Sequence, residues 1–315
     1  MPQISIITVN YKTPALVIQL IKSIYETTHG ISFEIIVVDN ASEDNGKQLI
    51  TKQFPSVVWI QNDENEGFAR GNNKGMQAAK GQYILLINSD VLVKDNTIAS
   101  CHDFYQKQVN PVILGCKLLN KDLTHQNSVY YSISGFKELL SYNLIISRLL
   151  KKQPKNLNDQ QEIKALMGAF LFFEKNILKK TGLFDDDFFL YSEEIEWQIR
   201  ARNSGIKLLY YNEAEVIHLG GESSKNKFSQ KQRHLSIALF FLKRYNRTGL
   251  VFYLFLQMIN LLSNIPFGII GKVKIKDLFS YYGSIFSPAL LIHYYKMFFR
   301  FKRNSKKVNY LVKVS

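Results

Sequence analysis

The chain contains a short, wholly apolar segment that stops abruptly at polar residues. Residues 83–87 read Tyr-Ile-Leu-Leu-Ile, and the next three are Asn88, Ser89 and Asp90. Such a run is typical of a strand buried on both faces, as in a parallel α/β sheet. Ligands of these sheets bind just beyond the carboxyl ends of the strands. Asp90 is therefore expected at a binding edge, although an aspartate here could also cap a helix beginning near Asp95.

Similar apolar or β-branched runs occur three more times before this segment. Strands are predicted at residues 4–10, 33–38 and 57–60. Helices are predicted at residues 14–25, 46–54 and 71–80. Strand and helix thus alternate through the first 90 residues, as in right-handed βαβ arrays that bind nucleotides. The predicted fold class is α/β, with a Rossmann-like, mostly parallel sheet flanked by helices.

Polar side chains stand at the ends of three of these strands, and they are Thr8, Asn10, Asp39 and Asp90. They are expected to share one rim of the sheet. An ionised Asp39 only accepts hydrogen bonds, so it suits an N–H of a uracil or thymine ring, or a ribose hydroxyl. A plain turn role for Asp39 is the alternative. Asp90, with the Asn88 amide two residues earlier, offers oxygen ligands for Mg²⁺ or Mn²⁺ holding a diphosphate.

A loop rich in glycine and asparagine occupies residues 65–75, between the third and fourth predicted strands. Both residue types accept left-handed backbone geometry, so the loop can turn tightly and expose N–H groups. Arg70 adds a permanent charge for a phosphate, and the next helix offers its positive N-terminus. The loop is neither a Walker loop nor a Gly-x-Gly-x-x-Gly dinucleotide motif. A plain turn into a helix is equally compatible with this spacing.

Several motifs follow one another in a recognisable order. They lie at residues 5–10, 37–40, 65–73, 86–90, 168–169, 182–185, 189–200 and 216–218. Together they resemble the inverting family-2 glycosyltransferases of the GT-A fold, and they look closest to the branch with bacterial rhamnosyltransferases of polysaccharide assembly. The resemblance covers residues 2 to about 224. It implies a GT-A domain over residues 1–224.

The resemblance also implies roles for individual residues. The implied donor-binding residues are Thr8, Asn10, Asp39, Asn65, Gly67, Arg70, Asn73, Asn88 and Ser89. The implied acceptor-binding residues are Gly168, Ala169, Tyr191, Glu193 and Trp197. Asp90 and His218 are the implied metal ligands, with the donor diphosphate completing the shell. A carboxylate with an imidazole suits Mn²⁺ better than Mg²⁺, although a lone histidine after an apolar run is more often structural.

Two motifs depart from the family pattern. The metal motif usually reads Asn-Pro-Asp or Asp-x-Asp, whereas Ser89 holds the middle place here and leaves Asp90 as a single carboxylate. The acidic motif usually reads Glu-Asp-x-Asp with an Asp as catalytic base, whereas here Glu194 and Glu196 hold both Asp positions. The resemblance therefore implies Glu194 as the base, which reaches one methylene further than aspartate.

The acidic motif also has a purely structural interpretation. Ser192 is a candidate N-cap, and acids in a first turn stabilise the helix by about 0.3–1 kcal/mol each. The neighbouring aromatic residues exceed what a cap requires, and they suit the face of a sugar ring. Arg200 lies four residues after Glu196, so the two are expected to form an ion pair on the helix surface.

The implied reaction is an inverting transfer from a dTDP- or UDP-sugar, dTDP-rhamnose among them, to a hydroxyl of a saccharide or lipid-linked acceptor in cell-surface polysaccharide assembly. Glu194 would deprotonate that hydroxyl, and the metal would neutralise the leaving diphosphate. A glycosidase would need two carboxyls flanking the bond. Two alternatives are a nucleotidyltransferase, which would release pyrophosphate, and a non-catalytic, membrane-bound nucleotide-sugar binder.

Residues 225–315 have a different character. They hold 17 Lys or Arg and one acid, Asp277, which is a net charge of +16, against +14 for the whole chain. No helix-turn-helix, zinc-finger or RNP-like motif accompanies this charge, so nucleic acid is not the expected partner. The expected partner is an anionic membrane surface. The segment is predicted to be a basic, aromatic-rich, helical region that associates with membranes.

Within this segment, residues 250–270 carry no charge. A narrow polar stripe recurs there at helical spacing, formed by Tyr253, Gln257, Asn260 and Asn264, and Pro266 and Gly268 are expected to interrupt the run. The pattern favours an interfacial helix over a packed tail helix or a spanning one. Farther on, the basic residues that fall on one helical face beside aromatic residues are Lys296, Arg300, Arg303 and Lys307. That pattern is typical of a helix on anionic lipid.

Cys101 and Cys116 do not form a disulfide framework, as in proteins of a reducing cytosol. The N-terminus runs directly into a predicted core strand and carries no signal-peptide pattern. We therefore expect a cytoplasmic protein, peripheral on the inner face of the plasma membrane. Residues 120–161, polar and basic around a short apolar patch, are expected to form an insertion beside the acceptor site.

Overall fold

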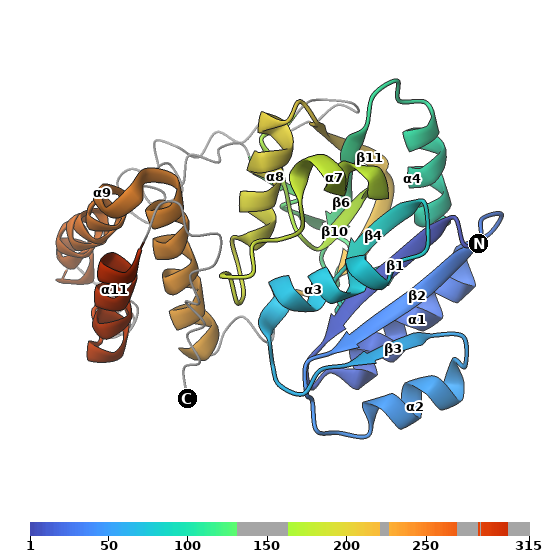
Figure 1. Cartoon of the computed structure of the whole chain (residues 1–315), viewed down its shortest axis with the longest axis horizontal. Coiled ribbons are helices and arrows are strands. Elements are labelled where there is room, and N and C mark those ends of the chain that lie inside the picture. Colours follow the sequence, from blue (N-terminus) through green and yellow to red (C-terminus); the bar gives the residue numbers. More distant parts are fainter. Residues whose placement is uncertain (131–162, 221–226, 270–282, 284, 302–315) are drawn as a thin grey trace. The chain divides into compact units, whose positions relative to one another are not determined.

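The computed structural model describes residues 1–130, 163–220, 227–269, 283 and 285–301 (Figure 1). The chain divides into two compact units. The first comprises residues 1–131, 155–186 and 193–221, and the second comprises residues 132–154, 187–192 and 222–315. Most of the predicted insertion at residues 120–161 lies outside the described residues, as do Arg303 and Lys307.

The first unit is built on one large sheet. Its strands are β1 (Ile4–Asn10), β2 (Phe33–Asp39), β3 (Val58–Gln61), β4 (Tyr83–Ile87), β5 (Val91–Val93), β6 (Val112–Leu119), β7 (His125–Gln126), β10 (Phe170–Glu174) and β11 (Lys207–His218). Among the described residues the order is β3-β2-β1-β4-β10-β6-β11-β5, with β7 beside β6. The first four strands run parallel, and β10 enters antiparallel between β4 and β6. A separate pair is formed by β8 (Val129–Tyr130) and β9 (Ala165–Leu166).

Helices flank this sheet, as Figure 1 shows. They are α1 (Pro14–Thr27), α2 (Gly46–Gln53), α3 (Gly67–Ala78), α4 (Thr97–Gln106), α7 (Leu178–Thr181) and α8 (Glu193–Asn203), with a short 3-10 turn η1 (Lys175–Ile177). This arrangement confirms the predicted α/β class. Asp90 precedes the strand β5, and α4 begins only at Thr97. The alternative that Asp90 caps that helix is therefore wrong.

Helix α3 lies unusually close to strand β1. A Cβ atom added at Gly71 would lie 3.0 Å from the Val9 side chain, and one added at Gly75 would overlap Ile7 Cγ2. Because these glycines are four residues apart, they lie on one face of the helix. The helix begins at Gly67, four residues earlier than predicted. The backbone of Gly67 itself turns into the helix with a left-handed φ of 83°, which glycine accepts without strain.

The core of the first unit lies on both faces of the sheet. All five residues of β4 are buried, as predicted for a strand covered on both sides. Strand β1 is equally buried at Ile4, Ile6 and Ile7. Each large apolar side chain buried in this way stabilises the fold by about 1.5–3 kcal/mol. The stability of the central strands allows polar residues to stand at their carboxyl ends.

The second unit contains two long described helices, α9 (Lys227–Ile269) and α11 (Pro288–Arg300). Helix α9 has a kink where Tyr245 and Asn246 leave helical geometry, so it consists of two helical segments. The second segment continues through Pro266 to Ile269. The predicted interruption at Pro266 and Gly268 is therefore wrong.

Candidate active site

The carboxyl ends of β1, β2 and β3 place three polar residues in one row. The strand register pairs Asn10 with Asp39, and Asp39 with Gln61. Asp39 accepts hydrogen bonds from Asn10 Nδ2 at 2.6 Å and Gln61 Nε2 at 2.8 Å, and two more from the backbone and hydroxyl of Ser42. Four donors fill the acceptor sites of a carboxylate, and Asp39 is only 3% exposed. Its carboxylate therefore joins the three strand ends to the following turn.

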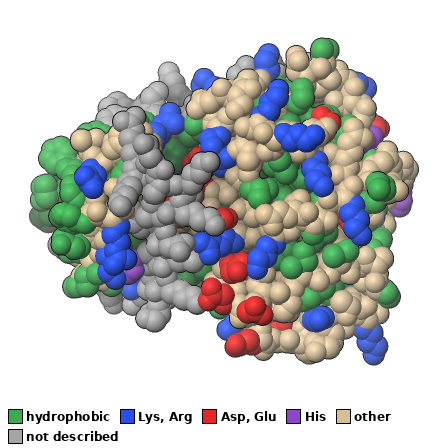
Figure 2. Space-filling view, in the orientation of Figure 1, with side chains coloured by type: hydrophobic (Ala, Val, Ile, Leu, Met, Phe, Trp, Pro, Cys, Tyr) green, Lys and Arg blue, Asp and Glu red, His purple; other side chains and the backbone are tan. Residues whose placement is uncertain are grey.

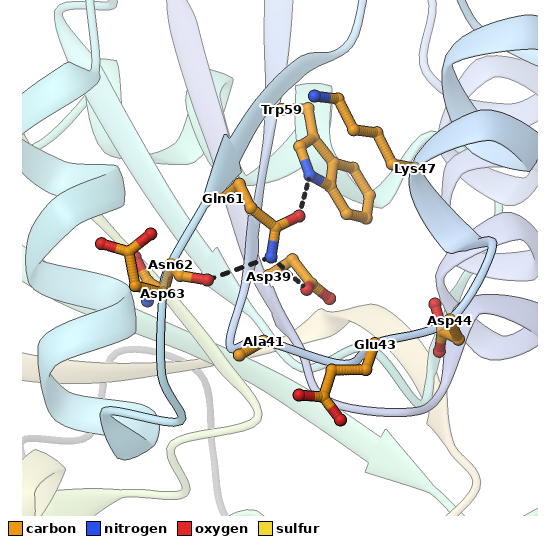
Figure 3. A pocket seen from close by; sticks show the side chains of 9 residues that line it. All are labelled: Asp39, Ala41, Glu43, Asp44, Lys47, Trp59, Gln61, Asn62 and Asp63. Carbon is orange, nitrogen blue, oxygen red and sulfur yellow. Dashed lines mark hydrogen bonds between the residues drawn. The ribbon is translucent and has the colours of Figure 1, made fainter.

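A pocket of about 250 Å³ opens beside this row (Figure 3). Its lining residues are Asp39, Ala41, Glu43, Asp44, Lys47, Trp59, Gln61, Asn62 and Asp63. Trp59 Nε1 donates to Gln61 Oε1 at 3.0 Å, and the Gln61 amide bridges from there to Asp39. An aromatic side chain with an adjacent amide offers stacking and hydrogen bonds to a planar ring.

Trp59 and Gln61 are not among the candidate site residues predicted from the sequence, which indicates only a strand at this segment. A usable signal existed. The two residues are two apart, so they share one face of β3. They also stand at the carboxyl end of the strand that pairs with the Asp39 strand.

Thr8 and Asn10 are completely buried. Asn10 Oδ1 accepts from the backbone and hydroxyl of Thr13, so this side chain joins the end of β1 to the start of α1. Ser89 Oγ lies 3.5 Å from the Thr13 hydroxyl. The Thr8 hydroxyl has no hydrogen-bond partner among the described residues. The hydrogen bonds between Asn10 and Thr13 therefore help to fix the position of the strand end at the rim.

The loop before α3 is held by local hydrogen bonds. Asn65 Oδ1 accepts from Gly67 N at 3.0 Å, which fixes the turn into the helix. Arg70 Nε donates to the carbonyl oxygen of Asp186 at 3.2 Å. Its guanidinium stays partly exposed at the same end of α3.

Asn73 lies one turn farther along α3 and is buried. Its amide bonds both the N–H and the carbonyl of Phe184 at 2.9 Å, and also Asp186 Oδ1 at 2.7 Å. These bonds engage both ends of the amide. Asn73 therefore holds residues 184–186 against α3, and the donor contact implied by its motif stays a prediction.

Asp90 and His218 meet although they are far apart in the sequence. Strand β5 pairs antiparallel with β11 so that His218 lies opposite Val91, and Leu219 N donates to Asp90 O at 2.9 Å. This register brings His218 Nε2 to 3.4 Å from Asp90 Oδ1. The other ring nitrogen, Nδ1, lies 2.7 Å from Gln126 Oε1. When Nδ1 carries the ring proton and donates it to Gln126 Oε1, Nε2 is unprotonated. Its lone pair then points toward the Asp90 carboxylate.

The residues at this point fit a divalent cation with two protein ligands. A carboxylate oxygen and an imidazole nitrogen at this separation can share one cation, and this donor set suits Mn²⁺. Asn88 Oδ1 is buried without a hydrogen-bond partner in the described part of the chain. No group of three or more His, Cys, Asp or Glu suited to a metal is found among the described residues. Further ligands would therefore come from the phosphates of a bound molecule.

Helix α8 begins with Glu193 and Glu194. The backbone of Gly168 packs directly on Glu194, since a Cβ atom added at Gly168 would lie 2.9 Å from Glu194 Cγ. The adjacent Ala169 accepts a hydrogen bond from Asn88 N at 3.1 Å. The segment of Gly168 and Ala169 thus joins the acidic start of α8 to the carboxyl end of β4.

Glu193 and Glu194 share a hydrogen bond. Burial of Glu193, together with the charge of Glu194, raises the pKa of Glu193 well above its ordinary value. The ionised form of Glu193 is therefore disfavoured, and Glu194 is the less buried of the two carboxyl groups.

The remaining residues of the acidic motif are structural. Trp197 is fully buried, and its indole N–H donates to Thr181 Oγ1 and Gly182 O at 3.0 Å each. The structure thus gives it a packing role, and the acceptor contact that the motif implies stays a prediction. The predicted ion pair is present, with Arg200 bonded to both carboxylate oxygens of Glu196 at 2.8 Å.

Tyr191 and Ser192 precede this helix and belong to the second unit. Both have positive φ, 73° and 70°, which is rare for residues other than glycine and costs of order 1–3 kcal/mol each. Ser192 thus lacks the extended backbone of an ordinary N-cap. The Tyr191 ring lies 5.1 Å from the Arg233 guanidinium.

The family model described as Glycosyl transferase family 2 matches residues 5–182. Among curated proteins, the low-salt glycan biosynthesis hexosyltransferase Agl10 of Haloferax volcanii is 24% identical over 226 residues, which cover 68% of this chain and 66% of that protein. Glycosyltransferase GlyG of Streptococcus pneumoniae is 28% identical over 153 residues, covering 48% of this chain and 50% of that protein. The chain thus spans from half to just under two thirds of the length of these relatives.

Solved structures show the same fold. S. aureus TarS 1–349 in complex with UDP-GlcNAc has a TM-score of 0.55 at 15% identity, covering 90% of this chain and 79% of that one. The mannosyltransferase PcManGT from Pyrobaculum calidifontis, in complex with GDP-Man and Mn²⁺, has a TM-score of 0.55 at 12% identity, covering 96% and 88%. The resemblance to the rhamnosyltransferase branch stays a prediction. With the family match extending over more than half of its length, this chain belongs to glycosyl transferase family 2 and has a GT-A-like α/β fold.

Proposed function

We propose that this protein transfers a sugar from a nucleoside-diphosphate donor to an acceptor hydroxyl. One observation carries the proposal. Asp90 and His218 face each other beside the end of β4, and the segment of Gly168 and Ala169 connects that end to Glu194. Family membership supports it, as do a relative named a hexosyltransferase and structures that contain UDP-GlcNAc and GDP-Man.

The donor would lie along the carboxyl edge of the sheet. The nucleobase of the donor would enter the pocket of Trp59, Gln61 and Asp39. The Gln61 amide is the exposed hydrogen-bonding group of these three. The diphosphate of the donor would extend toward Asp90 and His218. A Mn²⁺ or Mg²⁺ ion held by these two residues would neutralise the leaving diphosphate. Arg70, at the N-terminal end of α3, supplies a further positive charge for phosphate.

Glu194 is the proposed base. It would take the proton of the acceptor hydroxyl as the oxygen attacks the anomeric carbon, and the sugar–phosphate bond would break on the opposite face. A single displacement of this kind inverts the anomeric configuration. Burial raises the pKa of Glu193 and disfavours its ionised form, so its role would be to orient Glu194 and not to act as the base.

We further propose a dTDP- or UDP-sugar, dTDP-rhamnose among the candidates, as donor. The proposed acceptor is a saccharide or a lipid-linked saccharide of cell-surface polysaccharide assembly. A lipid-linked acceptor would place the enzyme at the inner face of the plasma membrane. The net charge of +16 in residues 225–315 supports this location, since anionic lipid attracts basic segments.

A screen of the purified full chain against nucleotide sugars tests the function. Thermal shift with Mn²⁺ should identify the donor, and turnover with that donor should release the nucleoside diphosphate. Release of pyrophosphate would instead show a nucleotidyltransferase. Donor binding without turnover on any saccharide acceptor would favour a nucleotide-sugar binder.

A further inference from the structure

The second segment of α9 has its polar side chains turned inward. Gln257 and the other residues of the polar stripe are each at most 2% exposed, and these are Tyr253, Asn260 and Asn264. Neither amide atom of Gln257 has a hydrogen-bond partner among the described residues. A buried amide left unpaired costs about 1–3 kcal/mol. The stripe therefore does not face water, as an interfacial helix would require.

The opposite side of the same segment is apolar and exposed. We call it the outer apolar face, and its members are Val251, Phe252, Phe255, Met258, Ile259, Leu262 and Ile269, between 38% and 72% exposed. Helix α11 adds exposed Leu291, Ile292, Tyr295 and Phe299. Figure 2 shows hydrophobic side chains gathered over these helices at the left of the view. Water-soluble helices have the reverse arrangement, with the apolar face inward.

Basic side chains flank the outer apolar face. The exposed ones are Arg244 and Arg247 at the start of the segment, and Lys296 and Arg300 on α11. Arg247 Nε donates to the carbonyl of Phe298 at 2.9 Å, so the start of the segment lies beside the end of α11 and the two helices are antiparallel. In the sequence, residues 248–271 carry no charge, and Lys272, Lys274 and Lys276 follow directly.

We propose that the second segment of α9 and helix α11 are embedded as a pair in an anionic phospholipid bilayer. The outer apolar face would lie among the acyl chains, and the basic side chains would lie among the headgroup phosphates. The reversed polarity is then favourable, because the exposed apolar surface leaves water on binding. The polar stripe stays sealed between protein elements.

The two helices differ in length. The stretch Phe228–Pro266 is long and apolar enough to cross a membrane by length and composition. The part of α9 after the kink at Asn246, residues 247–269, still measures about 34 Å at about 1.5 Å per residue. Helix α11 has 13 residues, or about 20 Å at about 1.5 Å per residue, whereas a bilayer core is about 30 Å thick. Basic residues also stand at both ends of the uncharged stretch, so both ends belong at headgroups.

A second copy of the chain is a poorer occupant of this surface. Two copies joined through the outer apolar face would bring Arg244, Lys296 and Arg300 of each close to those of the other, and like charges repel. An anionic bilayer complements both the apolar surface and the surrounding positive charge.

Flotation of the full chain with lipid vesicles tests the proposal. Binding should be strong to phosphatidylcholine vesicles that contain phosphatidylglycerol, weaker to phosphatidylcholine alone, and lowered but not abolished by high salt. The combined variant Phe255→Gln, Met258→Gln and Leu262→Gln should lower the partition coefficient by about a hundredfold. These side chains are already exposed, so the variant should keep its fold. The variant Arg244→Gln, Lys296→Gln and Arg300→Gln should weaken the preference for anionic vesicles.

A matched control has equally exposed apolar residues in the first unit. Val109 is 96% exposed and Leu123 58%, and Val109→Gln with Leu123→Gln should leave flotation unchanged. Wild-type protein that stays in solution beside anionic vesicles would overturn the proposal. If light scattering then shows a dimer that the Phe255, Met258 and Leu262 variant dissociates, the occupant is a second copy. The readout is independent of glycosyl transfer, so it separates this proposal from the function proposed above.

Discussion

Two buried glutamines show how differently the two units treat polar groups. Gln198 of α8 is 0% exposed, and its amide accepts from Leu166 N at 2.7 Å and donates to Leu166 O at 3.0 Å. Gln257 of α9 is 1% exposed, and no partner for either amide atom is found among the described residues. At this pair of positions the first unit satisfies the buried amide and the second leaves it unpaired, and the second unit also exposes an apolar face.

The same contrast holds for the surfaces. In the first unit, Asp39 is surrounded by four donors before any ligand arrives. In the second, the side chains presented to solvent along α9 include Phe255, Met258 and Leu262. The first unit therefore buries a saturated polar network at its strand ends, whereas the second exposes large apolar side chains.

The largest expected effect concerns Asp90. Asp90→Ala should reduce turnover to background and abolish Mn²⁺-dependent donor binding, since it removes the carboxylate that the described residues place at the proposed metal position. The fold should persist, because the side chain stands beyond the end of β4 and not in the core. Calorimetry with Mn²⁺ and donor, beside circular dichroism, measures both. Wild-type turnover in this variant would refute the metal assignment.

Glu194→Gln should lower kcat by roughly 10²–10⁴ and leave donor affinity unchanged, because it keeps the shape and removes the base. Glu193→Gln should be milder, since burial raises the pKa of Glu193 and makes it the poorer base. Steady-state kinetics with a fixed acceptor compares the two variants. A larger loss in Glu193→Gln would place the base one residue earlier, and full activity in both would exclude a one-base mechanism.

Gln126→Leu should weaken Mn²⁺ binding by about 10–100-fold, because a partner that orients a metal-binding histidine has effects of that size. The neighbouring His125 is exposed, and His125→Ala serves as the control that should change nothing. Mn²⁺ titration of the purified protein provides the measurement. Unchanged affinity in Gln126→Leu would show that His218 needs no orienting partner.

The pair of glutamines gives the sharpest test of the contrast between the units. Gln198→Leu should destabilise the protein by about 2–3 kcal/mol, because it leaves the backbone of Leu166 unpaired inside the first unit. Gln257→Leu should be neutral or stabilise by about 1 kcal/mol, because it removes an amide that has no partner. Chemical unfolding of the full chain measures both. Equal destabilisation would mean that the buried amide of Gln257 stabilises the second unit as much as that of Gln198 stabilises the first.

The smallest expected effect is a pH dependence at Glu215. Lys117 at 2.7 Å and Lys94 at 3.0 Å lower the pKa of its carboxyl. Since the folded pKa lies below the unfolded one, the pairs stabilise the fold above about pH 4.5, and this contribution disappears as pH falls through the lowered pKa. For partly exposed pairs it amounts to about 1 kcal/mol or less. In Glu215→Gln, the urea midpoint of unfolding should fall less on acidification than it does in the wild type. An unchanged pH dependence would show that other groups cause the acid sensitivity.

Much of the first unit could be predicted from the sequence. The buried run at residues 83–87, the β-branched runs before it and the polar residues after each strand gave the α/β class and the position of the rim. The pairing of Arg200 with Glu196 was equally predictable, since residues four apart on a helix are neighbours. These features depend on local periodicity, which a sequence displays directly.

Other parts of the site depended on which strands pair. His218 reaches Asp90 because β11 runs antiparallel to β5 in one particular register, and no local pattern encodes that register. Gln126 joins them from a third strand. Trp59 and Gln61 became candidates only once β3 was seen beside β2.

The sequence by itself determined the alternation of helices and strands in the first 90 residues, which residues stand at strand ends and where the charge is concentrated. Only the tertiary structure decided which way amphipathic side chains point. Trp197 lies in the core, and the polar stripe of α9 is buried. The periodicity of a helix shows that two faces differ, whereas the neighbouring elements and the surrounding medium decide which face turns inward.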